Sequence, residues 1–178
     1  IHSLMKIWSS RLKELAASGA VAVGDVATVG WPRECFPAEA VHATVFLELL
    51  GLDPEREEGL FAMGQSFVRD LLDKPGKLRP GLSPHAPYTV SPRLVERVCQ
   101  LSRQERFPVA MHLAESQEEL ELLASHSGAM VETLKALGAW HPAAVPRGAR
   151  PLDYLRQLAV ARRALVIHGT HLAADEMQ

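Results

Sequence analysis

The chain has 178 residues, of which 47% are hydrophobic and 22% are charged, and its formal net charge is −2. These values are typical of a globular domain with a sizeable core, and they exclude a disordered chain, which would be less apolar and more strongly charged. The near-neutral charge argues against nucleic acid as a partner, and no apolar run approaches the roughly 18 residues of a membrane helix, so neither partner is expected.

Hydrophobic patterning predicts strands that alternate with helices along the chain. Five short apolar runs predict buried strands, near 20–27, 43–50, 78–82, 108–113 and 164–168. Helical spacing or capping residues predict helices over 4–17, over 55–72, from Ser91-Pro92, in a Glu-rich segment after Ser116, over 130–137 and over 152–161. This alternation predicts an α/β fold with a parallel sheet.

One connection in this pattern is unusual. The segment 29–42, between the first two predicted strands, contains two prolines and is barely long enough for a parallel crossover. We expect a loop over 30–41, and either this unit is degenerate or ordered pieces have been joined across a missing loop.

Histidines gather at the ends of the predicted strands. Active sites of parallel sheets lie at the carboxyl ends of the strands, and three of the five predicted strands lead into His85, His112 or His168. Scattered core histidines would not concentrate in this way. Asp25 and Glu48 also lie at strand ends, but acidic groups there can equally cap helices, so their role stays open. The remaining histidines are predicted to lie on the surface: His2, His42, His126, His141 and His171.

The segment 112–115 (HLAE) gives the most specific local signal. An imidazole at a strand end can bind a divalent ion, and Glu115 could take a proton from a metal-activated water and return it to a leaving group. The alternative is a buried structural His112 beside a solvated Glu115. The position at the end of a parallel strand favours the functional interpretation.

Two further segments carry candidate site residues. His168 ends an apolar strand, and Gly169 lets the backbone turn beside it, so His168 is a candidate ligand or proton shuttle. Two prolines fix the loop around His85 and hold it in place for a ligand. The alternatives are a capping His168, and a rigid turn in which His85 only packs.

Together the segments 83–91 (SPHAPYTVS), 112–116 (HLAES) with Glu119, and 168–172 (HGTHL) resemble strands four, five and six of the barrel in the metal-dependent amidohydrolase superfamily. The branch that they resemble holds S-adenosylhomocysteine/methylthioadenosine deaminases, aminofutalosine deaminases, guanine deaminase and chlorohydrolases. The resemblance implies a (β/α)8 TIM-type barrel, incompletely represented in this chain. Residues 1–178 would form a single partial barrel domain with strands two to six, without strand one, strands seven and eight and the family's small β-sandwich.

The resemblance also implies roles for the site residues. His112 corresponds to the metal ligand, Glu115 to the catalytic acid and base, His168 to the histidine that supports the attacking oxygen or binds a second metal, and His85 to a substrate-binding residue. The family's strand-one His-x-His pair is absent from this sequence. No lysine stands at the end of the strand before His85, which favours one divalent metal ion, zinc first, with iron, nickel or manganese as alternatives.

The function predicted from these residues is a hydrolase that deaminates a purine-like or related amino-heterocycle and releases ammonia. The alternatives are hydrolysis of a C–Cl or cyclic amide bond on the same scaffold, and a non-catalytic barrel fragment. The expected partner is a small-molecule substrate. The oligomeric state stays open, because the exposed sides of a partial barrel favour either association with a further copy of the chain or instability. Only two cysteines and no signal peptide predict a cytoplasmic protein.

Overall fold

The computed structural model describes residues 2–31, 41–73 and 76–177, with side chains from residue 10 onward. In this part of the chain five parallel strands form one sheet, whose order β1-β2-β3-β4-β5 follows the chain. The elements are α1 (His2–Ala17), β1 (Ala22–Ala27), β2 (His42–Leu49), α2 (Pro54–Leu72), β3 (Leu78–Pro84), α3 (Pro92–Glu105), β4 (Val109–Leu113), α4 (Gln117–Ser125), α5 (Ala129–Ala136), the 3-10 helix η2 (Pro142–Ala144), α6 (Pro151–Leu158), β5 (Ala164–His168) and the 3-10 helix η3 (Ala174–Glu176).

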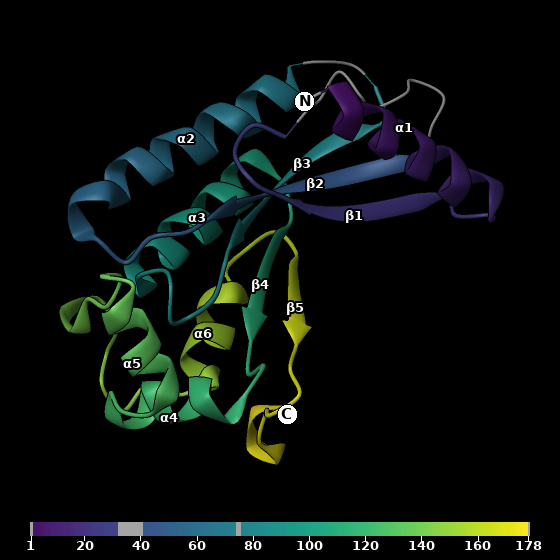
Figure 1. Ribbon diagram of the computed structural model, residues 1–178. Helices are drawn as coiled ribbons and strands as arrows, with labels where there is room; N and C mark the ends of the chain where they lie inside the picture. The colour runs from purple at the N-terminus through teal and green to yellow at the C-terminus, as the bar shows by residue number, and fades with distance from the viewer. Residues whose placement is uncertain (1, 32–40, 74–75, 178) are drawn as a thin grey trace.

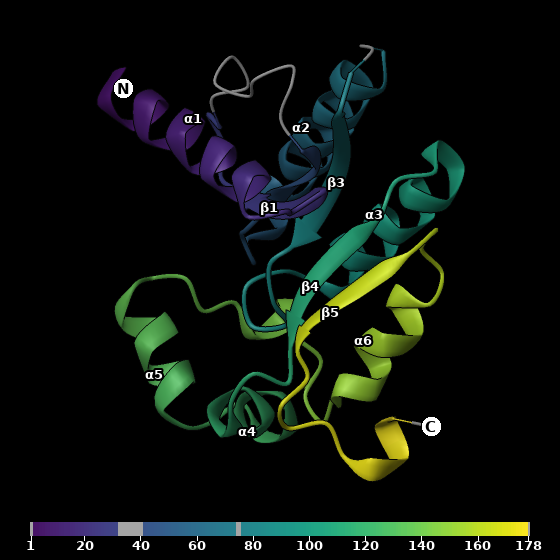
Figure 2. The same ribbon diagram turned by 90° about the vertical axis from the view of Figure 1, so that its right-hand side faces the viewer.

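The sheet forms a twisted wall with helices packed on one side. Figure 1 shows β4 and β5 running steeply across the direction of β1 and β2. Helix α2 contacts β2 and β3, α3 contacts β3 and β4, and α6 packs beside α3 (Figure 2). This half-barrel confirms the predicted parallel α/β architecture. None of the helices in the described ranges is long and apolar enough to cross a membrane.

The hydrophobic core lies between the sheet and these helices. Val109, Met111 and Leu113 of β4 are fully buried and belong to one cluster with Val95 and Val98 of α3. Every second residue of a strand faces the same way, so the residues between them face the opposite, concave side of the sheet. Strand β5 is apolar, yet each of its five residues is at least partly exposed.

Side-chain caps determine where the helices that flank the site begin. Ser91 accepts a hydrogen bond from the backbone N–H of Leu94 at 3.0 Å, and Pro92 occupies the first turn of α3, as its fixed φ allows. Ser116 accepts a hydrogen bond from the backbone N–H of Glu119 at 3.3 Å, which starts α4. These caps fix the direction in which the chain leaves β3 and β4.

The structure differs from the sequence-based elements mainly at their ends. Strand β3 continues to Pro84, two residues beyond the predicted end, and α6 ends at Leu158 instead of residue 161. The 3-10 helices were not predicted, because three residues leave no periodic pattern. The predicted loop over 30–41 falls mainly on 32–40, which lie outside the described residues.

Candidate active site at the carboxyl ends of the strands

Side chains from four strands meet at one edge of the sheet. Glu48 comes from the end of β2, His85 follows β3, His112 lies on β4 and His168 ends β5. The ring centroids of His85 and His112 are 5.0 Å apart, and those of His112 and His168 are 5.4 Å apart. The three strand-end histidines therefore form one contiguous row.

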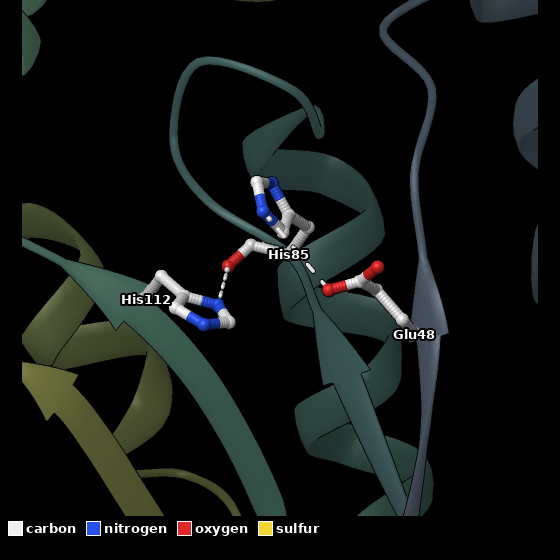
Figure 3. A group of neighbouring side chains, drawn as sticks. All are labelled: Glu48, His85 and His112. Atoms are coloured by element: carbon white, nitrogen blue, oxygen red, sulfur yellow. Dashed lines mark hydrogen bonds and ion pairs between the residues drawn. The ribbon is translucent and has the colours of Figure 1, made fainter. Parts of the chain in front are cut away.

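Glu48, His85 and His112 are arranged like the ligands of a metal ion. Each offers one ligand atom, and the three atoms lie within 4.8 Å of one another (Figure 3). His85 Nε2 is 4.0 Å from Glu48 Oε1. Ser83, which pairs with Glu48 in the sheet, has a fully buried hydroxyl with no hydrogen-bond partner in the described part of the chain. A buried hydroxyl of this kind beside Glu48 is compatible with a polar or ionic ligand at these strand ends.

Hydrogen bonds determine which ring nitrogen carries the proton in His112 and in His85. His112 Nδ1 lies 3.2 Å from the backbone oxygen of His85, which can only accept, so Nδ1 donates and Nε2 carries the lone pair. His85 Nδ1 lies 2.7 Å from Thr89 Oγ1, and the Thr89 hydroxyl donates to the Ala86 carbonyl at 3.2 Å. Nδ1 of His85 therefore donates to Thr89, and its Nε2 lone pair is free.

The resulting donor set suits a divalent metal ion. Two imidazole nitrogens and one carboxylate are ligands typical of zinc and related ions, and ligating histidines commonly donate their other N–H to a carbonyl or a similar acceptor. Burial lowers the pKa of His85, and the nearby Glu48 carboxylate only partly opposes this. His85 is therefore neutral near neutral pH, as a metal ligand must be.

Glu115 lies beside this row of rings. Its Oε1 is 3.3 Å from His168 Nε2, and its Oε2 accepts a hydrogen bond from the Tyr88 hydroxyl at 3.4 Å. Burial, together with nearby carboxylates, raises the pKa of Tyr88 to about 12, so its hydroxyl remains a donor. The Tyr88 ring also meets His85 edge-on, with centroids 5.7 Å apart. Glu115 is held between a hydroxyl donor and an imidazole, at the half-exposed rim of the site.

Two residues at this edge have a backbone conformation that L-residues rarely adopt. Ala114 has φ +54° and His168 has φ +72°, directly after β4 and at the end of β5. Sheet register places His168 opposite Leu113, whose side chain is buried in the core, yet the His168 ring lies near His112. The left-handed turn thus breaks the alternation of the strand. Such strain is concentrated at functional sites.

All four residues predicted for the site are brought together: His85, His112, Glu115 and His168. Glu48 lies with them. It is one of the two acidic residues whose role the sequence left open. Asp25 does not join them, because its carboxylate accepts a hydrogen bond from Trp31 Nε1 at 3.0 Å in a pocket shared with Leu12 of α1. Burial raises the pKa of Asp25.

Sequence reasoning assigned no role to Tyr88 and Thr89. Both lie within the segment 83–92, so their nearness to His85 was a usable signal. The contact of Tyr88 with Glu115, 27 residues further on, was not visible in the sequence.

The histidines predicted to be on the surface differ among themselves. His42 is exposed, as predicted, although it begins a strand. His126 is half-buried, so its prediction holds only in part: its ring packs edge-on against Trp140, and its Nε2 is buried without a hydrogen-bond partner in the described residues. His171 is half-buried, and its Nδ1 lies 2.9 Å from Gln117 Nε2.

Comparison with known proteins supports the resemblance given by the motifs. No known family profile matches the chain. The aminodeoxyfutalosine deaminase of Deinococcus radiodurans is 30% identical over 176 residues, which cover 92% of this chain and 41% of that protein. A 5-methylthioadenosine/S-adenosylhomocysteine deaminase of Shouchella clausii is 38% identical over 82 residues, 45% of this chain and 19% of that protein.

Solved structures show the same fold. The crystal structure of Helicobacter pylori aminofutalosine deaminase in complex with methylthio-coformycin matches with a TM-score of 0.79 at 23% identity, covering 95% of this chain and 41% of that one. Guanine deaminase from C. acetobutylicum with bound guanine matches with a TM-score of 0.64 at 18% identity, covering 97% of this chain and 40% of that one.

The fold is a parallel α/β half-barrel, and its candidate site lies at the carboxyl ends of the strands, where the active sites of barrel enzymes lie. More particularly, this chain is similar in sequence to aminodeoxyfutalosine and 5-methylthioadenosine/S-adenosylhomocysteine deaminases, so the resemblance to the amidohydrolase branch predicted from the three motifs is confirmed. The prediction of an enzyme is also confirmed, because the relatives named above are deaminases. The chain spans only 41% of the length of the Deinococcus relative.

Proposed function

We propose that this chain carries part of the active site of a metal-dependent hydrolase that deaminates an adenosine-like substrate and releases ammonia. One observation above all supports the proposal. The Glu115 carboxylate lies 3.3 Å from His168 and shares a strand-end edge with His112, whose Nε2 lone pair is free. A proton carrier and a metal-ligating imidazole at one edge suit the addition of water to a C–N carbon. The names of the relatives support the adenosine-like substrate class.

A divalent ion, zinc first with iron, nickel or manganese as alternatives, would be held by His112, with Glu48 and His85 as further donors from this chain. When bound, the ion supplies the Lewis acidity that lets a water molecule lose its proton near neutral pH. The predicted role of His85 is contact with the substrate. Zinc affinity of a His85→Asn variant distinguishes the two roles, because loss of affinity indicates a ligand and unchanged affinity indicates a substrate contact.

Glu115 moves the proton in this proposal. It takes a proton from the attacking water and delivers it to the departing amine, so that water and the amino substrate become the hydroxylated product and ammonia. The hydrogen bond from Tyr88 at 3.4 Å holds one of its oxygens, and the other stays beside His168. His168 stabilises the negative charge that develops on the attacking oxygen.

We further propose that residues 1–178 belong to one partial barrel domain, equivalent to strands two to six of the relatives' barrel. The match to about two fifths of the Deinococcus relative, 41%, supports this assignment. The carboxyl ends of β3, β4 and β5 supply His85, His112, Glu115 and His168, and further residues would complete the barrel and its metal ligands.

Ammonia release from the zinc-loaded protein tests the proposed function. The substrates are adenosine, 5-methylthioadenosine, S-adenosylhomocysteine, aminodeoxyfutalosine and guanine, compared with chlorinated and cyclic amide analogues. Glu115→Gln should lower kcat by roughly 10²- to 10⁴-fold. Glu118→Gln, which removes an exposed carboxylate three residues further along, should leave kcat unchanged. Chloride or acid release without ammonia would instead support the C–Cl or cyclic amide alternative, and no turnover at all would support a non-catalytic fragment.

A further inference from the structure

Glu119 is a buried carboxylate that the proposed chemistry does not use. It lies in the first turn of α4 and is fully buried. A glutamate at this position commonly reaches back to the N–H of the capping residue, here Ser116. Instead its Oε1 accepts a hydrogen bond from the backbone N–H of Ala114 and its Oε2 accepts one from the backbone N–H of Glu115, both at 2.9 Å. Both oxygens therefore bind the segment that carries the acid–base residue.

The backbone of this segment needs such support. Ala114 is fully buried and left-handed at φ +54°, a conformation that its Cβ disfavours. Its carbonyl accepts a hydrogen bond from His171 N–H at 2.9 Å, which connects the segment to the chain after β5. Without Glu119, the buried N–H of Ala114 would lose its acceptor. The carboxylate thus holds the chain in the turn that directs it from β4 towards the rim of the site.

We propose that Glu119 is a positioning residue for Glu115. Its two hydrogen bonds fix the backbone at 114–115, so that the Glu115 carboxylate faces His168 and Tyr88. The inference rests on the proposed function only in its last step, because the backbone clamp exists whether or not Glu115 transfers protons. The competing interpretation is a purely structural helix cap, which Ser116 already supplies.

Solution NMR of the 178-residue chain tests the clamp directly in the wild type. We expect scalar couplings across the hydrogen bonds, from the amide nitrogens of Ala114 and Glu115 to the side-chain carboxyl carbon of Glu119. We also expect a single χ1 rotamer for Glu115. Absence of both couplings in the folded wild type would overturn the proposal.

Two matched variants separate positioning from capping. Glu119→Gln keeps the size of the side chain and one acceptor oxygen, but it turns an N–H group towards a backbone N–H. It should lose one coupling, average the Glu115 rotamers and lower kcat by about 10- to 100-fold with KM unchanged. Ser116→Ala removes the cap of the same helix. It should lower the Tm but keep both couplings and kcat.

The outcomes distinguish this proposal from the proposed function. If the wild type releases no ammonia, the proposed function fails, and the couplings and Glu115 rotamers of the two variants still decide whether Glu119 positions Glu115. If Glu119→Gln lowers kcat no more than Ser116→Ala, or leaves the Glu115 rotamer unchanged, Glu119 is only a helix cap and the proposal is wrong.

Discussion

Gly81 in β3 is a position where the structure leaves no room for a side chain. A Cβ there would lie 2.5, 2.8 and 3.0 Å from three atoms of the Phe46 ring. Phe46 is the register partner of Gly81 on β2 and is 7% exposed. The backbone of Gly81 is not left-handed, so any cost of Gly81→Ala comes from displacing this ring. The position tests whether β2 and β3 pack below the site as described.

The expected magnitude follows from two opposing effects. Extra volume in a packed interior lowers the free energy of unfolding by about 1–3 kcal/mol, and replacing glycine by alanine in a permitted conformation raises it by about 0.4–1 kcal/mol. Gly81→Ala should therefore lower the free energy of unfolding by about 1–2 kcal/mol. Gly59→Ala is the matched control, because Gly59 is exposed within α2 and a Cβ there meets nothing within 4 Å. It should raise the free energy of unfolding by about 1 kcal/mol.

Urea unfolding of the two variants gives these free energies. Phe46→Leu should lower the free energy of unfolding less in the Gly81→Ala background than in the wild type, because the smaller side chain leaves room for the new Cβ at position 81. The coupling free energy between the two substitutions should exceed about 0.5 kcal/mol. A Gly81→Ala protein as stable as the wild type would refute the packing argument. Equal effects of Gly81→Ala and Gly59→Ala would refute it as well.

Three further predictions concern the site and the core. Thr89→Val removes the acceptor of His85 Nδ1 at 2.7 Å and should weaken zinc binding by about 10- to 100-fold in a chelator competition titration, whereas unchanged affinity would show that His85 is no ligand. Tyr88→Phe removes the donor to Glu115 and should lower kcat for ammonia release by up to about tenfold, and an unchanged kcat would contradict its role. Burial raises the pKa of Cys99 to about 12, above its unfolded value of about 8.5, so the stability that the neutral thiol contributes is present below about pH 8.5 and is lost as the pH rises towards 12. The free energy of unfolding should therefore fall more steeply above about pH 9 in the wild type than in Cys99→Ala, and parallel pH curves would contradict this.

The sequence was sufficient for the sheet and for the row of histidines. Short apolar runs between turn residues located all five strands, and the rule that parallel strands end at one edge selected His85, His112 and His168. Glu115 followed from its place three residues after His112. Each of these inferences needs only local pattern and strand direction, which a single sequence carries.

The rest of the site depends on which face of a strand a residue occupies. The run 20–27 is apolar on both faces, so the sequence could not show that Asp25 faces α1. Glu48 joins the histidines through its register with Ser83, and strand register cannot be predicted from a doubly buried strand. The left-handed backbone at His168 turns its side chain to the side of the sheet opposite to the one that strand alternation predicts. Because His168 is not a glycine, the sequence does not indicate a left-handed conformation there.

Metal analysis of the purified, dialysed protein shows whether the residues at the strand ends bind a metal ion. The wild type and His112→Asn are loaded with zinc, dialysed and compared by elemental analysis, with the intact mass of each sample recorded. We expect about one zinc per wild-type chain and none in His112→Asn, because His112 belongs to the group of possible ligands and its Nε2 lone pair is not used by the hydrogen bond at Nδ1. Wild type without zinc, or His112→Asn with as much zinc as the wild type, would contradict this expectation.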